Sequence, residues 1–238
     1  MRIRTLALLA SLTLGACGGD EPAPPPDPAP TTEVPEPELE VPRGLNLHVT
    51  SELVYASLPD VPHELVATYQ GLEHGRWVIS RVADEDGDRQ IEYRAGDRAF
   101  RLPQDRTVSE EYLGAERDAV LRRMELRRIA LGLGLDEPPW DDEGALELGG
   151  GLGRIERGDL EQGGQVLTLR TPTGAEEESL RILGWQQHGL GTRPTRLELW
   201  FGGAHIWTET VTDFSVDGWF KPRYFWPPDR ADEAESGY

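Results

Sequence analysis

The chain has 238 residues, of which 37% are hydrophobic, and it carries 43 acidic residues against 24 lysines and arginines. This composition is typical of a globular protein that folds on its own hydrophobic core. The net charge of −19 argues against nucleic acid as a partner, because phosphate binding requires a basic surface. The single cysteine, Cys17, excludes a disulfide within the chain.

Residues 1–16 have the pattern of a secretion signal. Arg2 and Arg4 precede an apolar run at residues 6–14, which is shorter than the roughly 18 residues that a membrane-spanning helix needs. The sequence Leu-Gly-Ala-Cys at residues 14–17 resembles the lipobox of bacterial lipoproteins, with a bulky aliphatic residue, two small residues and a cysteine in that order. The resemblance implies cleavage before Cys17, a diacylglyceryl group on its thiol and an acyl chain such as palmitate on its new amine.

A conventional signal peptidase site with a free Cys17 is the alternative. Leu14 disfavours it, because the −3 position of that site takes a small residue. Gly18 follows Cys17, where an aspartate would indicate inner-membrane retention in enterobacterial lipoproteins. By this analogy the sequence predicts a lipid-anchored protein of the outer membrane that faces the periplasm.

Residues 17–43 are rich in proline and glutamate. Proline fixes φ and removes a hydrogen-bond donor, so this stretch is predicted to be a disordered, extended tether. A motif that binds a partner is the alternative. We therefore expect a signal peptide at 1–16, a lipidated tether at 17–43, a β-rich periplasmic domain at 44–228 and a frayed acidic tail at 229–238.

The first half of the domain predicts an antiparallel meander. Alternating apolar residues indicate strands at 63–69, 76–82, 89–94 and 99–102, separated by glycine- and aspartate-containing turns. A helix is predicted at 110–133, where Thr107 and Glu110 fit a capping box and Gly132 and Gly134 mark the end. Residues 141–164 are interpreted as loop with short strands.

The last third predicts four more strands, at 165–170, 179–185, 195–201 and 204–214. Gly202 and Gly203 form a two-residue hairpin turn between the last two. In the final strand, Ile206 and Phe214 are expected to share one face with Thr208, Thr210 and Thr212.

The order of strands, one helix and further strands resembles the LolA/LolB-like family of periplasmic lipoprotein carriers and receptors. The residues that carry the resemblance are Val-Thr-Asp-Phe-Ser-Val-Asp-Gly at 211–218 and Tyr-Phe-Trp-Pro-Pro at 224–228. The resemblance implies an α+β fold, mainly antiparallel, in which a curved sheet or half-barrel is covered by one main helix.

Catalytic and metal-binding patterns are missing from the sequence. Asp84, Asp86 and Asp88 have the alternation of a calcium loop, but Arg89 stands where the loop needs glycine. The five histidines lack zinc-hydrolase spacing, and no Gly-x-Ser-x-Gly nucleophile motif occurs. We therefore predict no enzymatic activity, no catalytic residues, no metal and no cofactor.

Two clusters have both a structural and a functional interpretation. The helix arginines Arg122, Arg123, Arg127 and Arg128 fit a solvated face, with an i,i+4 pair of Asp118 and Arg122, or a surface for lipid phosphates or an acidic partner. The aromatic residues of the C-terminal part fit core packing or the wall of an apolar pocket; they are Trp200, Trp207, Trp219, Phe220, Tyr224, Phe225 and Trp226.

The sequence thus predicts a membrane-anchored envelope lipoprotein that binds an apolar ligand such as an acyl chain, with ligand-binding residues unassigned. The alternatives are a module for protein–protein interaction in the envelope and a hydrolase whose site is assembled from dispersed residues. A large apolar hollow favours the first function, and a filled core favours the interaction module.

Overall fold

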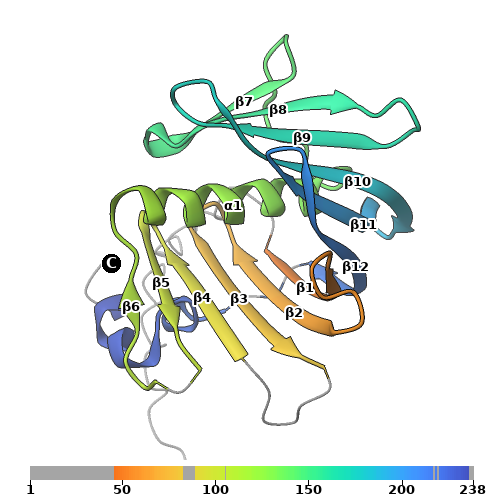
Figure 1. The fold of residues 1–238 in the computed structure, drawn as a ribbon. Helices are drawn as coiled ribbons and strands as arrows, with labels where there is room; N and C mark the ends of the chain where they lie inside the picture. Colours follow the sequence, from red (N-terminus) through yellow and green to blue (C-terminus); the bar gives the residue numbers. More distant parts are fainter. Residues whose placement is uncertain (1–45, 83–88, 105, 217, 219, 236–238) are drawn as a thin grey trace, which may run out of the picture. The chain divides into compact units, whose positions relative to one another are not determined.

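A computed structural model describes residues 46–82, 89–104, 106–216, 218 and 220–235. Its main feature is one antiparallel sheet in the order β6-β5-β4-β3-β2-β1-β12-β11-β10-β9-β8-β7 (Figure 1). The strands are β1 (Leu47–Tyr55), β2 (Pro62–Gln70), β3 (His74–Arg81), β4 (Arg89–Ala95), β5 (Arg98–Leu102), β6 (Glu110–Glu111), β7 (Ala145–Leu148), β8 (Gly153–Asp159), β9 (Gln165–Arg170), β10 (Glu176–His188), β11 (Gly191–Phe201) and β12 (Ala204–Val216).

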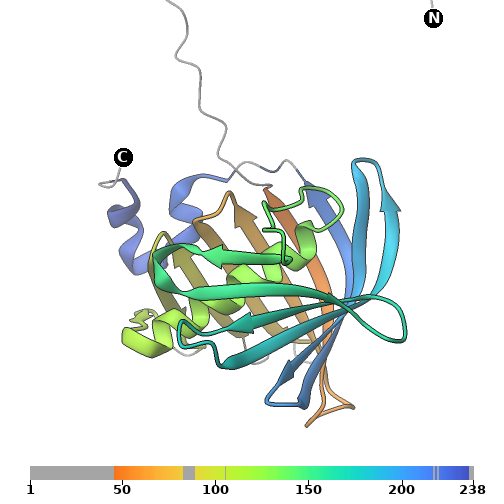
Figure 2. The ribbon, with the colours of Figure 1, turned by 90° about the horizontal axis from the view of Figure 1, so that it is seen from above.

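The sheet curves around its one long helix, α1 (Gly114–Gly132). Figures 1 and 2 show α1 on the concave side, with β1–β6 on one side of it and β7–β9 on the other. The predicted fold class, a curved antiparallel sheet covered by one main helix, is therefore confirmed.

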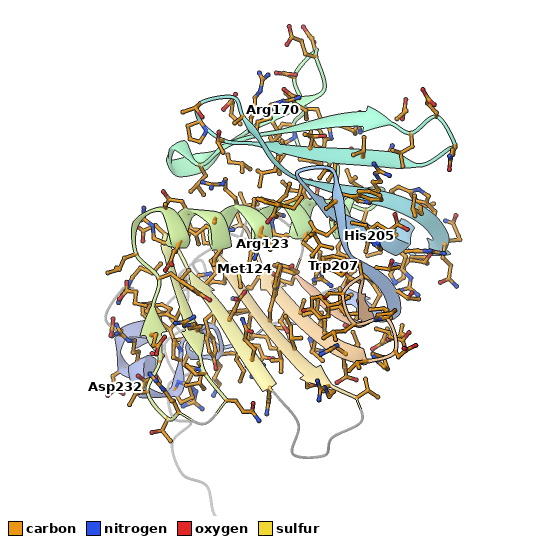
Figure 3. All side chains as sticks on the ribbon, in the orientation of Figure 1. Arg123, Met124, Arg170, His205, Trp207 and Asp232 are labelled. Atoms are coloured by element: carbon orange, nitrogen blue, oxygen red, sulfur yellow. The ribbon has the colours of Figure 1, made fainter. Side chains whose placement is uncertain are left out.

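The core fills the space between helix and sheet. One continuous cluster joins buried residues of α1, such as Met124 and Leu131, to strands near both ends of the sheet, from Ala99 on β5 to Leu148 on β7. Trp207 of β12, labelled with Met124 in Figure 3, belongs to the same cluster. The helix thus occupies most of the concave face.

The C-terminal segment covers part of the opposite face of the sheet. It contains two 3₁₀ helices, of which η2 (Pro222–Phe225) lies against β3 and β4, and η3 (Pro228–Glu235) lies against η2. Asp229 accepts hydrogen bonds from the backbone and side chain of Ser109, at 3.0 Å each, and Glu233 pairs with Arg98 at 2.5 Å. The expected frayed tail at 229–238 is therefore wrong for its described part, because these carboxylates bind donors on the domain.

Most predicted elements are confirmed, with local differences. Strand β9 and the Gly202–Gly203 turn occur where predicted, and residues 141–164 contain the short strands β7 and β8. The capping box is wrong, because Glu110 lies in β6 and the helix begins at Gly114 without a side-chain cap. Strand β1 was not predicted from the sequence. It joins the two halves of the sheet by pairing with both β2 and β12.

Several predictions lie outside the described residues. They are the signal peptide at 1–16, lipidation of Cys17, the tether at 17–43, the aspartate turn at 84, 86 and 88, and the place of Trp219. Among the described residues, no helix is long and apolar enough to cross a membrane.

Candidate ligand-binding cleft

An open cleft of about 1100 Å³ lies along one side of α1. Its other walls come from the turn between β2 and β3, the turn between β4 and β5, the loop after α1, and β7 with the residues that follow it. The lining residues are Leu47, Leu72, Glu73, Arg94, Gly96, Asp97, Arg117, Asp118, Leu121, Glu125, Arg128, Ile129, Gly132, Asp136, Glu137, Pro138, Pro139, Leu146, Glu147, Leu148, Gly149, Gly150 and Leu152.

One face of α1 forms the floor of the cleft. The helix residues that line it recur at intervals of three and four, at positions 117, 118, 121, 125, 128, 129 and 132, as one helix face requires. With about 1.5 Å of rise per residue, this face extends over roughly 22 Å. That length exceeds the depth of one lipid leaflet's hydrocarbon, about 15 Å.

The floor combines apolar side chains with one charged triad. Leu121 and Ile129, which are 3% and 2% exposed, lie one helical turn before and after Glu125. The Glu125 carboxylate binds Arg94 of β4 and Arg128 of α1, each with a shortest distance of 2.6 Å. Burial opposes the charged form of Glu125, but the two guanidinium groups outweigh burial and hold the pKa of this carboxyl below its usual value.

The rim of the cleft is acidic. Glu73, Asp97, Asp136, Glu137 and Glu147 line it and are exposed to solvent. The third arginine of the lining, Arg117, is engaged by its neighbour Asp118 at 2.7 Å. The cleft therefore has an apolar floor, a cationic point at Arg94 and Arg128, and negative charge at its mouth.

A second charged network lies deeper, on the side of α1 that packs on the sheet. Arg127 of α1 and Glu209 of β12 are 2% and 0% exposed in their side chains and form an ion pair. Ser51 donates to Glu209 at 2.6 Å, and Arg127 and Trp77 donate to the Tyr69 hydroxyl at 3.1 and 2.8 Å. Burial raises the pKa of Tyr69. The network holds the helix on the concave face of the sheet, and its residues do not line the cleft.

The predicted solvated arginine face of the helix is wrong. Arg122 and Arg127 are buried, Arg128 binds Glu125 in the cleft, and Arg123 reaches Glu178 of β10 at 2.6 Å. The helix lies between two parts of the sheet (Figure 1), so Arg122, Arg127 and Arg128 are largely shielded from solvent, and only Arg123 keeps substantial exposure, at 40% of its side chain.

The C-terminal aromatic residues that the structure describes do not line the cleft. Trp207 lies in the main core, Trp226 packs with Phe100 on the other face of the sheet, and Phe225 is fully buried. Phe220 stacks on Tyr224 with ring centroids 4.9 Å apart. For the described aromatic residues, core and surface packing is the correct interpretation, and the apolar pocket walled by them is not found.

Sequence reasoning missed the residues that form the cleft. The periodic face of α1 was detectable in the sequence, but Arg94 and Glu125 are 31 positions apart and only the fold brings them together. In the described part of the chain, no group of three or more metal-binding side chains occurs. The cleft is built from helix, turn and strand residues that only the fold brings together.

Comparison with known proteins gives structural likeness without sequence likeness. No protein-family model and no curated protein matches the chain. A domain from Vibrio parahaemolyticus named for outer membrane lipoprotein sorting has 8% identity and a TM-score of 0.41, and covers 80% of this chain and 90% of its own. A LolA superfamily protein from Nitrosomonas europaea has 9% identity and a TM-score of 0.41, with 76% and 90% covered.

A DUF1329 family protein from Desulfovibrio piger has 7% identity and a TM-score of 0.39, with 78% and 90% covered.

Proposed function

We propose that this chain is a lipid-anchored protein of the bacterial envelope whose domain binds the acyl chain of a lipid or a similar apolar ligand in the cleft along α1. The observation that carries the proposal is the cleft itself. Its volume of about 1100 Å³ is that of a site for a sizeable small molecule, and Leu72, Leu146 and Leu152 give it accessible apolar surface.

The proposed role is binding and not catalysis. Arg94, Glu125 and Arg128 are tied to one another by ion pairs, which suits the fixed charges of a binding site. A partly enclosed apolar floor lowers the free energy of a bound chain by about 0.8 kcal/mol for each methylene that it removes from water.

The proposed place of action is the outer membrane, on the periplasmic side, with Cys17 as the site of lipid attachment. This part of the proposal rests on the lipobox sequence at residues 14–17. Two or more acyl chains give stable attachment, whereas one gives only marginal binding. The proline-rich segment at 17–43 would then hold the domain away from the membrane surface.

Cell fractionation tests the anchor. The wild-type chain is expected in the membrane fraction, labelled by a palmitate analogue, and Cys17→Ala is expected to lose the label. A wild-type chain that is secreted into the soluble fraction without label would contradict lipidation and support conventional cleavage.

Native mass spectrometry tests ligand binding. The predicted mature chain, residues 17–238 with Cys17→Ala, is expected to carry co-purified lipid or to bind added lipid at a ratio of one to one. Its failure to bind any acyl compound would overturn the proposed function.

A second function, a protein–protein interaction module of the envelope, is supported by one observation. The concave face of the sheet is filled by α1 and its core, which joins both ends of the sheet, so the half-barrel itself is not a hollow container. A chain that binds no lipid but forms a stable complex with a purified envelope protein would favour this function.

A further inference from the structure

We infer that the cleft recognises the acidic group of an amphiphile, a carboxylate or a phosphate, through Arg94 and Arg128, while the apolar chain lies along the helix floor. This inference rests on the proposed function and names the class of ligand. It requires that the triad have spare charge, spare hydrogen-bond donors and access to the cleft.

The triad carries an excess positive charge. Two guanidinium groups share one carboxylate, that of Glu125, and the side chains of Arg94, Glu125 and Arg128 are only 14%, 12% and 11% exposed. Arginine remains protonated in such surroundings. In a site partly shielded from water, an unbalanced guanidinium charge attracts an anion more strongly than it would on an open surface.

The triad also has unused donors. Arg94 directs Nη1 to Glu125 and Nε to the Gly96 carbonyl, and Arg128 directs Nε and Nη2 to Glu125. Among the described residues, no acceptor binds Nη2 of Arg94 or Nη1 of Arg128. Both arginines line the cleft, and the geometry of a guanidinium matches carboxylate and phosphate oxygens.

The position of the triad fits a ligand with a chain. Leu121 and Ile129, one helical turn on either side of Glu125, are almost fully buried beneath the cleft. The apolar lining residues that are exposed or half-buried are Leu72, Pro138, Pro139, Leu146 and Leu152. Gly132 adds no side chain to the floor, and a Cβ atom placed there would meet no atom within 4 Å. An acidic group at the arginines therefore leaves apolar surface in reach of its chain.

The acidic rim affects which anionic ligands the cleft prefers. Glu73, Asp97 and Glu147 line the mouth of the cleft and are exposed. Their charges act within a Debye length of about 8 Å at physiological salt, so they repel anions that remain at the mouth. A single acidic group placed deep on the triad is favoured over a head group with several negative charges.

Matched probes with one chain length test the inference on the mature chain with Cys17→Ala. We expect dodecanoate and dodecyl phosphate to bind at least tenfold more tightly than dodecanol, since a hydrogen-bonded charge is worth about that factor. Inorganic phosphate alone is expected to bind much more weakly than dodecyl phosphate. Phosphate that binds as tightly as dodecyl phosphate would overturn the amphiphile and identify a site for the free anion.

Variants of the triad separate recognition from folding. Glu125→Gln removes the competing carboxylate and is expected to tighten dodecanoate severalfold, with dodecanol unchanged. The triple variant Arg94→Gln/Glu125→Gln/Arg128→Gln leaves no unpaired charge and is expected to reduce the dodecanoate preference to within about twofold of dodecanol. Arg106→Gln, an exposed arginine outside the cleft that pairs with Glu110, is the control and is expected to retain the preference.

The outcomes are distinct. Equal binding of dodecanoate and dodecanol to the wild-type chain, or an unchanged preference in the triple variant, would overturn the inference and leave the proposed acyl binding intact. Binding of neither probe would overturn the proposed function, and this inference with it.

Discussion

Arg127 and Glu209 are the charged pair on which the packing of α1 most depends. They come from elements 82 positions apart in the sequence and meet in the core. Removing a charge from water costs several kcal/mol, and only a partner with good geometry and further hydrogen bonds offsets that cost. Ser51 and Tyr69 supply those hydrogen bonds, so the pair specifies one position of the helix on the sheet.

Substitution of Arg127 alone should therefore be severe. Arg127→Met leaves Glu209 buried without a countercharge, and we expect the free energy of unfolding to fall by about 3–5 kcal/mol. The double variant Arg127→Met/Glu209→Leu should lose less than the sum of the two single variants, as measured by urea denaturation. Arg106→Met, which breaks the exposed pair with Glu110, is the control and should change stability by less than about 1 kcal/mol. Additive losses would contradict the coupling.

Glu125 should make stability depend on pH at the acidic side. Its folded-state pKa lies below the ordinary value of 4.5, so its ion pairs contribute stability above that pH, and the contribution disappears as the pH falls through the depressed folded value. Glu125→Gln should thus be less stable than wild type at pH 7, with a difference that shrinks below about pH 4.5. Glu161→Gln, at an exposed loop position, is the control; a difference that stays constant with pH would contradict the account.

At the scale of elements, the start of α1 shows what local sequence signals could not determine. Thr107 and Glu110 have the spacing of a capping box, but Glu110 pairs with Arg101 in the sheet, and the helix begins one turn later behind Leu113. Leu113 occupies the N-cap position with an extended backbone, but its apolar side chain has no acceptor that could cap the helix. This side chain is 73% exposed, so its replacement removes little packing.

A capping residue at position 113 should therefore increase the stability of the protein. Leu113→Ser should raise the free energy of unfolding by about 1 kcal/mol, because the new hydroxyl can accept from a free amide of the first turn. Thr107→Ala, at the position predicted from sequence, should leave stability nearly unchanged. Thermal and urea unfolding measure the stability of both variants. A large loss of stability in Thr107→Ala with no gain in Leu113→Ser would indicate that Thr107 caps the helix.

Strand prediction succeeded where local patterns suffice. Residues 165–170 alternate, and the glycine pair at 202–203 takes the positive φ angles of a tight hairpin turn. Strand β1 was missed because Ser51 interrupts its buried face between Val49 and Leu53; Ser51 is buried there and donates a hydrogen bond to Glu209. The predicted alternation places Phe214 on the same face as the threonines of β12. In the structure, the pairing of β1 with β12 shifts register between Thr50 and Ser51, and beyond this irregularity Val211 and Phe214 are both buried.

At the scale of the whole molecule, the curved sheet is not an empty half-barrel. Its concave side is filled by α1, and the space for a ligand lies beside the helix, between the strand turns on one side and β7 on the other. The sequence could indicate the sheet and the helix. The cleft itself depends on tertiary pairings such as Arg94 with Glu125, which no local pattern encodes.

The most direct test of the account is to fill the cleft from its floor. Gly132 lines the cleft, leaves open space within 4 Å of where a Cβ atom would lie, and does not require a positive φ, so Gly132→Trp should fold and occupy the site. Gly189→Trp, at the β10–β11 turn with equally open surroundings, is the matched control. Titration with a fluorescent acyl probe should show binding to wild type and Gly189→Trp and a loss of at least tenfold in Gly132→Trp; equal binding by all three would contradict acyl-chain binding in this cleft.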